Sequence, residues 1–204
     1  NPNKPSPYAL KELVWGLAKY ARAVQEAGLV PIIEPEILMD GDHELEVCKI
    51  IQRRMLQEVY WACSVTDVYL EGTLLKPSMT VPGTDCKDKS NPKEIAKTTI
   101  EVMKNSVRSK VPGIVFLSGG LSEEAASVYL NEMHQFDTPW NVSFSYGRAL
   151  QHSCLKQWAG SDVNAGQAAV LARAQANSEA SKGQYVTGSQ PSSDEALFVA
   201  GYTY

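Results

Sequence analysis

The segment Tyr69-Leu70-Glu71-Gly72-Thr73-Leu74-Leu75-Lys76-Pro77 decides how the rest of this sequence is interpreted. Its apolar residues predict a short strand that ends on Lys76. Burial favours the neutral form of a lysine amine, and a neutral amine is a nucleophile that forms Schiff bases with carbonyl compounds. The alternative for a single strand-end lysine is an ammonium group that points into solvent, so neighbouring motifs have to distinguish the two.

Helical and strand patterns alternate on both sides of this segment. Helices are predicted at about 8–27, 40–62, 91–109, 122–134, 148–158 and 164–180, and strands at about 29–33, 69–77, 114–117 and 140–145. This alternation predicts an α/β fold with a parallel sheet and helical crossovers. Four strands make half of a (β/α)8 TIM barrel. The sheet is therefore either an open, doubly wound one or part of a barrel of which the rest is missing from this chain.

Composition excludes several classes of function. The 204 residues carry a formal net charge of −4, which does not favour nucleic acid or an anionic membrane as a partner. No apolar run approaches the roughly 20 residues of a membrane span. The four cysteines and three histidines are widely spaced and form no metal-ligand pattern, so no metal and no cofactor are expected. Free thiols of this kind are typical of a reducing compartment.

Polar residues follow each of the four predicted strands. They are Glu34 and Glu36 after the first strand, Lys76 after the second, Ser118-Gly119-Gly120 after the third, and Ser145 with Gly147-Arg148 after the fourth. In parallel α/β proteins, the carboxyl ends of the strands converge on one face, where ligands bind. We therefore expect these residues to form one site.

The chemistry of these residues is mutually consistent. Glu34 and Glu36 are two residues apart, so on an extended chain both point to one face beside Lys76. Ser118-Gly119-Gly120 offers a hydroxyl and unhindered backbone N–H groups to a phosphate, and Arg148 offers a bidentate guanidinium. Singly, each motif has an ordinary alternative: solvated carboxylates, a common turn, an unrelated ion pair. Together they predict a lysine nucleophile, paired acids and a phosphate site for a phosphorylated carbonyl compound.

Four segments resemble the class I fructose-bisphosphate aldolases, in the same order and with similar spacing. They are Ile33-Glu34-Pro35-Glu36-Ile37-Leu38, Leu70-Glu71-Gly72-Thr73-Leu74-Leu75-Lys76-Pro77, Phe116-Leu117-Ser118-Gly119-Gly120 and Phe144-Ser145-Tyr146-Gly147-Arg148-Ala149-Leu150. The resemblance runs from about Ala9 to the terminal Tyr204. It implies metal-independent cleavage and condensation of fructose 1,6-bisphosphate, to and from dihydroxyacetone phosphate and glyceraldehyde 3-phosphate.

The resemblance also implies a role for each residue. Lys76 forms the Schiff base, Glu34 is the acid/base of carbinolamine dehydration with Glu36 beside it, and Tyr204 assists proton transfer at the third carbon of the substrate. The first phosphate is assigned to Ser118, Gly119, Gly120, Ser145, Gly147 and Arg148. The polar segment that begins at Ser181 is expected to be a flexible tail, 181–204, after a barrel part, 1–180.

The chain departs from this family in length. Class I aldolases are at least half again as long, and the part without a counterpart here carries the first four barrel strands. The chain alone is therefore expected to be inactive. The resemblance implies a homotetramer in the cytosol or the plastid stroma, possible cytoskeletal partners and no membrane insertion. The alternatives are a catalytically idle binding module and, less favoured by the motifs, a different Schiff-base lyase on the same barrel.

Overall fold

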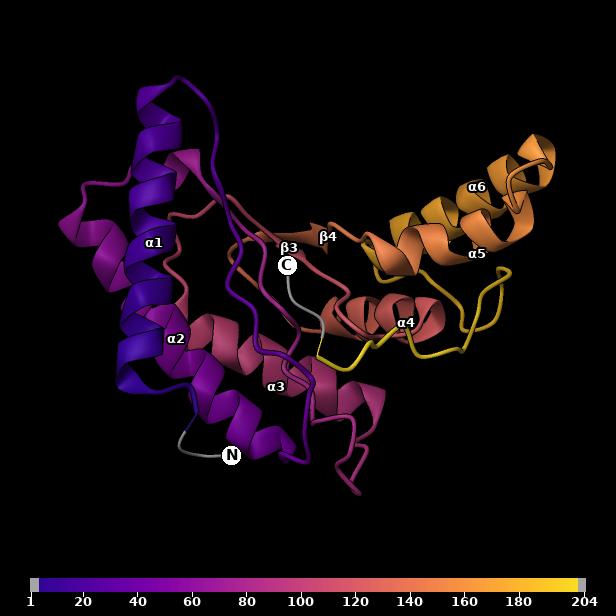
Figure 1. Ribbon diagram of the computed structural model, residues 1–204, viewed down its shortest axis with the longest axis horizontal. Helices are drawn as coiled ribbons and strands as arrows, with labels where there is room; N and C mark the ends of the chain where they lie inside the picture. Colours follow the sequence, from indigo (N-terminus) through magenta and orange to yellow (C-terminus); the bar gives the residue numbers. More distant parts are fainter. Residues whose placement is uncertain (1–3, 202–204) are drawn as a thin grey trace.

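The computed structural model describes residues 4–201, and alternating helices and strands make up most of them (Figure 1). The helices are α1 (Pro7–Glu26), α2 (Leu45–Val65), α3 (Pro92–Ser106), α4 (Glu123–Met133), α5 (Arg148–Trp158) and α6 (Val163–Ala180). The strands are β1 (Ile32–Ile33), β2 (Leu74–Leu75), β3 (Gly113–Phe116) and β4 (Asn141–Phe144), and a 3-10 turn, η1 (Leu70–Gly72), precedes β2. The predicted alternation is confirmed.

Local sequence explains where several helices begin. Ser6 caps α1 by accepting a hydrogen bond from the Ala9 N–H, and Pro7 occupies the first helical position. Asn91 caps α3 in the same way through the Glu94 N–H, as the Asn-Pro-Lys-Glu sequence predicts. Ser122 caps α4 through the Ala125 N–H. These side chains satisfy N–H groups that have no partner within their own helix.

The four strands form one parallel sheet in the order β1-β2-β3-β4. A doubly wound sheet reverses its strand order at a switch point, and this sheet does not. Successive right-handed crossovers in one direction place their helices on the same face. Accordingly α1 packs on α2, α2 on α3, and α3 on α4 (Figure 1). The sheet is therefore singly wound, as in part of a barrel, and the doubly wound alternative is wrong.

Three predicted boundaries are wrong. Tyr69 and the 3-10 turn η1 (70–72) replace the first part of the predicted strand, because the Gln25 side chain on α1 forms hydrogen bonds with the Tyr69 N–H and carbonyl and with the Gly72 carbonyl. Leu29 and Val30 precede β1 and are 65% and 64% exposed, since β1 is an edge of the sheet. The second helix begins at Leu45 instead of near position 40.

The segment after α6 also differs from expectation. We expected residues 181–190 to be too polar to pack, but Tyr185 is buried and its hydroxyl donates to Glu124. From there the chain crosses back along α4 to the centre of the molecule (Figure 1). Leu197 is also buried, so described residues of this tail are packed against the fold. The mobility of the tail stays a prediction.

Candidate active site

Lys76 and Glu34 form an ion pair at the carboxyl ends of neighbouring strands. The register Ile33↔Leu75 places Glu34 directly beside Lys76, each being the first residue after its strand. Lys76 Nζ lies 3.0 Å from Glu34 Oε2, with side chains that are 21% and 47% exposed respectively. The expected meeting of lysine and carboxylate is thus present. The lysine reaches it from the end of a two-residue strand, and part of its side chain remains open to solvent.

The loops that follow these two residues are tied together by a buried polar network. Ser78 Oγ accepts a hydrogen bond of 3.0 Å from the Ile37 N–H, joining the Lys76 loop to the Glu36 loop. Gln52 on α2 is fully buried, donates to the Ser78 carbonyl at 2.6 Å and accepts from the Thr80 hydroxyl. This network therefore holds both loops at a fixed separation.

The sequence contains a signal for this network. Gln52 is the polar member of an otherwise apolar helical face that includes Cys48, Met55, Leu56 and Val59. A buried amide on such a face needs hydrogen-bond partners, which indicates a neighbouring loop. The identity of that loop depends on packing.

Glu36 lies near the predicted phosphate residues. Together with Gly120, Arg148 and Phe198, it lines a cavity of about 20 Å³. A Cβ atom placed on Gly119 would lie 3.4 Å from Glu36 Oε1, so this carboxylate is next to the Ser118-Gly119-Gly120 turn. Glu34 and Glu36 therefore face different partners: the first meets the lysine and the second meets the turn.

The structure brings the two predicted phosphate-binding segments to the same sheet edge. The register Phe116↔Phe144 sets Ser145 beside Leu117, and the Ser145 N–H donates to the Phe116 carbonyl at 2.9 Å. Gly119 adopts a positive φ of 54°, a conformation that favours glycine in this turn. Gly147 is the N-cap residue of α5 and offers no side-chain cap, so the first N–H groups of this helix are suited to an anion.

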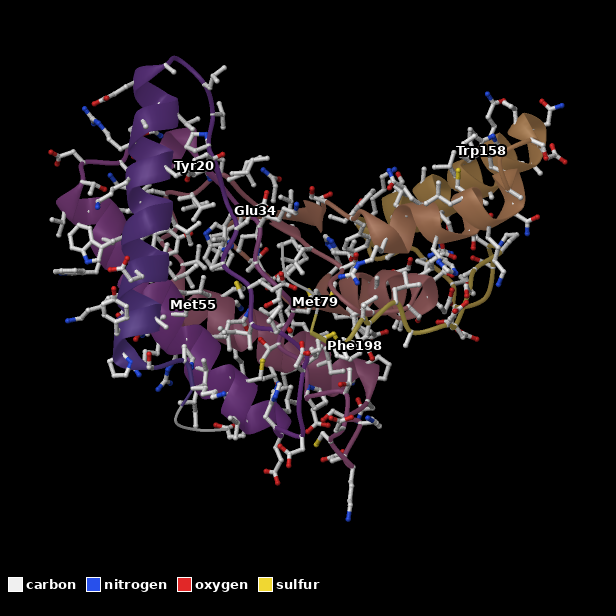
Figure 2. All side chains as sticks on the ribbon, in the orientation of Figure 1. Tyr20, Glu34, Met55, Met79, Trp158 and Phe198 are labelled. Atoms are coloured by element: carbon white, nitrogen blue, oxygen red, sulfur yellow. The ribbon has the colours of Figure 1, made fainter. Side chains whose placement is uncertain are left out.

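The tail crosses this region. The Leu197 N–H donates to the Gly120 carbonyl at 3.1 Å, and Arg148 Nη1 donates to the Leu197 carbonyl at 2.6 Å. A Cβ on Gly120 would lie 2.8 Å from Phe198 Cβ, so only glycine permits this approach. In Figure 2, Met79 and Phe198 lie near each other in the central part of the molecule, and Glu34 lies above them in this view.

The cavity beneath the tail is too small for a sugar phosphate. Its volume of about 20 Å³ corresponds to about one water molecule. Leu197 and Phe198 lie against Gly120, so a phosphate that binds at Gly120 has to displace them. Further along the tail, the Gly201 N–H donates to Asp40 Oδ1 at 3.1 Å, on the loop that follows Glu36. Tyr204 itself lies outside the described residues.

Two other properties follow from the described part of the chain. Within residues 4–201, no group of three or more His, Cys, Asp or Glu side chains is arranged to hold a metal ion. None of the described helices is both long and apolar enough to cross a membrane.

The fold and the site together define a class of protein: part of a TIM barrel with a lysine–carboxylate pair at the carboxyl ends of its strands. The family model "Fructose-bisphosphate aldolase class-I" matches residues 1–204. The chain belongs to this family.

Similar proteins agree over the whole chain. The chain is 49% identical to the chloroplastic fructose-bisphosphate aldolase 2 of Arabidopsis thaliana, covering 100% of this chain and 52% of that protein. It is 50% identical to the cytosolic fructose-bisphosphate aldolase 4 of the same plant, covering 99% and 53%. The crystal structure of Plasmodium falciparum fructose-bisphosphate aldolase, in complex with TRAP and a small-molecule inhibitor, matches with a TM-score of 0.88 and 44% identity, covering 90% of this chain and 54% of that chain. The chain thus spans about half the length of its relatives.

Proposed function

We propose that the protein that carries this chain cleaves and forms fructose 1,6-bisphosphate through a Schiff base at Lys76. Family membership supports the reaction, and the observation that supports the residue is the 3.0 Å contact between Lys76 Nζ and Glu34 Oε2. The products of cleavage are dihydroxyacetone phosphate and glyceraldehyde 3-phosphate.

The chemistry divides among the residues at the strand ends. The Lys76 amine attacks the ketone carbon, and Glu34 supplies the proton with which the carbinolamine hydroxyl leaves as water. The resulting iminium accepts the electron pair of the breaking carbon–carbon bond, while the hydroxyl proton of the departing aldehyde goes to a base. The third carbon is then reprotonated with the help of Tyr204, and water releases the ketone product from the lysine.

The phosphate next to the ketone carbon is assigned to Ser118, Gly119, Gly120, Ser145, Gly147 and Arg148. Backbone N–H groups at the start of α5 and the guanidinium of Arg148 complement its charge. Glu36 lines the same cavity as Arg148, and we assign it an orienting role there.

The assembly and location of the protein are also part of this proposal. We infer a homotetramer, to be checked by light scattering, with residues 1–180 as part of the barrel and 181–204 as a flexible tail. We infer a cytosolic protein, with the plastid stroma as the alternative. A cytosolic and a chloroplastic relative are about equally similar to this chain, at 50% and 49% identity. Cell fractionation distinguishes the two compartments.

The direct test uses the product of the complete reading frame that contains this chain. Borohydride added with dihydroxyacetone phosphate should reduce a Schiff base and attach the substrate to the peptide that contains Lys76, as read by mass spectrometry. An adduct on another lysine, or none, would overturn the assignment of Lys76.

A further inference from the structure

One carboxylate on α4 holds the tail in three places. Glu124 accepts hydrogen bonds from the Tyr185 hydroxyl at 2.7 Å, from the Gly188 N–H at 2.9 Å and from the Ser192 hydroxyl at 2.7 Å. These donors lie 61 to 68 residues further along the chain. The neighbouring Glu123 accepts from the Ser193 N–H at 3.0 Å. The tail from position 185 to 193 is therefore attached to the start of α4.

A fully buried arginine on α6 contacts both α4 and the tail and so supports this attachment. Arg173 on α6 donates to the Glu123 carbonyl at 2.8 Å and to Ser127 Oγ at 2.6 Å, and its other terminal nitrogen lies 3.9 Å from Glu124 Oε2. It also donates to the Pro191 carbonyl at 3.4 Å. A buried charge of this kind requires partners, so the network links α4, α6 and the tail as a unit.

The electrostatics of Glu124 agree with a role as a hydrogen-bond acceptor. Partial burial of the carboxylate raises its pKa, but the hydrogen bonds from Ser192, Tyr185 and Gly188 and the charge of Arg173 outweigh this effect, so the pKa of Glu124 is lowered. The carboxylate is thus held in the charged form that accepts all three bonds.

The attachments divide the tail into two parts. Residues 185–193 are held on α4 by Glu123 and Glu124. The residues after them make their contacts elsewhere: Glu195 pairs with His152 on α5 at 3.3 Å, Leu197 donates to the Gly120 carbonyl and accepts from Arg148, and Gly201 donates to Asp40. Ser193 lies 11 residues before Tyr204, and Ser181, where α6 ends, lies 23 residues before it. The effective concentration of a tethered group falls roughly as the −3/2 power of the tether length. A tether that starts at Ser193 instead of Ser181 therefore raises the effective concentration of Tyr204 at the site about threefold.

We propose that Glu124 is a positioning residue whose carboxylate, together with Arg173, fixes the point from which the C-terminal arm swings and so sets how often Tyr204 reaches Lys76. This inference rests on the proposed function. In this proposal the segment 185–193 is the attached part of the tail, and only the residues after it move.

The first test measures attachment without any use of activity. Hydrogen–deuterium exchange of the Glu124→Ala protein should be at least tenfold faster in peptides from 184 to 193 than in the unaltered protein, with unchanged exchange in β3. Glu132→Gln, on the same helix, is the matched control and should alter neither. Tyr185→Phe removes one hydroxyl donor and serves as the milder variant if Glu124→Ala fails to fold. Unchanged exchange of the tail in both Glu124→Ala and Tyr185→Phe would overturn the proposal.

The second test separates positioning from general stability. Glu124→Gln should lower kcat for the bisphosphate about threefold and leave borohydride trapping of dihydroxyacetone phosphate at Lys76 unchanged. In a protein that lacks Tyr204, Glu124→Gln should have no further effect on kcat. A further loss of the same size there would overturn the positioning role. If no adduct forms at Lys76 in any variant, the proposed function fails, whereas the exchange experiment still decides whether Glu124 holds the tail.

Discussion

Lys76 and Glu34 lie side by side because their strands are parallel and in register. Each residue follows the last paired position of its strand, Ile33 opposite Leu75, and the Lys76 N–H donates to the Ile33 carbonyl at 2.8 Å. The 3.0 Å contact between the amine and the carboxylate therefore depends on backbone pairing and on no long-range loop. The pair places a carboxylate within proton-transfer distance of an amine.

Lys76→Met should abolish borohydride trapping and lower cleavage of the bisphosphate by several orders of magnitude, because the covalent route is lost. Turnover is measured in the product of the complete reading frame. Lys110→Met is the control: this lysine is exposed, pairs with Glu71 at 3.2 Å and should have little effect. Near-normal turnover of Lys76→Met would contradict the Schiff-base mechanism.

Arg148→Ala should weaken binding of phosphorylated substrates by about 1.5–3 kcal/mol, the range for a hydrogen bond to a charged group. Isothermal titration with dihydroxyacetone phosphate measures the change. The matched control is Arg54→Ala, since Arg54 is an exposed cation that pairs with Glu58 on α2. If the alanine variants at positions 148 and 54 bind equally well, Arg148 does not contact the phosphate.

Removal of Tyr204 should slow cleavage of fructose 1,6-bisphosphate markedly and leave trapping at Lys76 and the melting temperature nearly unchanged. Gly201, three residues before Tyr204, donates to Asp40 on the loop that follows Glu36. Tyr202→Phe, which retains Tyr204, is the control. Full turnover without Tyr204 would show that Tyr204 takes no part in the reaction and that residues of the barrel suffice.

Gln52→Ala should lower the free energy of unfolding by about 1–3 kcal/mol for each polar group left unsatisfied, here the Ser78 carbonyl and the Thr80 hydroxyl. Urea unfolding followed by fluorescence measures this loss. The control is Gln57→Ala. Gln57 lies on the same helix, its exposed amide makes only a 3.4 Å contact to the Asn105 carbonyl, and its replacement should lower the free energy of unfolding far less. Equal losses in the two variants would show that the buried network contributes nothing specific.

Cys48 and Cys63 should resist alkylation in the folded protein, because burial raises the pKa of each thiol from 9.0 to about 11. Iodoacetamide at pH 8 should modify the half-buried Cys154 first, and peptide mapping gives the order. The raised pKa also predicts a pH effect on stability. Both thiols stay protonated below pH 9, but ionisation of the unfolded chain lowers the free energy of unfolding as pH rises from about 9 to 11. Faster reaction at Cys48 than at Cys154 would contradict the burial.

Much of the fold and the site could be predicted from local sequence. The alternation of helix and strand patterns predicts the parallel sheet. Lys76 directly follows β2, and Arg148 begins the helix after β4. Since parallel strands end at a common edge, their convergence needs no further information. Helix starts marked by a capping residue, such as Asn91 before α3, were predicted closely. The start of α2 was not, because its N-cap, Glu44, makes no side-chain cap hydrogen bond.

What the tertiary structure alone decided is where the polar segments between and after these elements lie. Tyr185, Gly188 and Ser192 belong to a segment whose composition predicts solvation, yet all three bond to Glu124. Their position depends on how α4, α5 and α6 pack, which places a charged carboxylate and the buried Arg173 beside this part of the tail. Local sequence determines which residues can make hydrogen bonds. Only the assembled fold brings a donor within 3 Å of an acceptor more than 60 residues away.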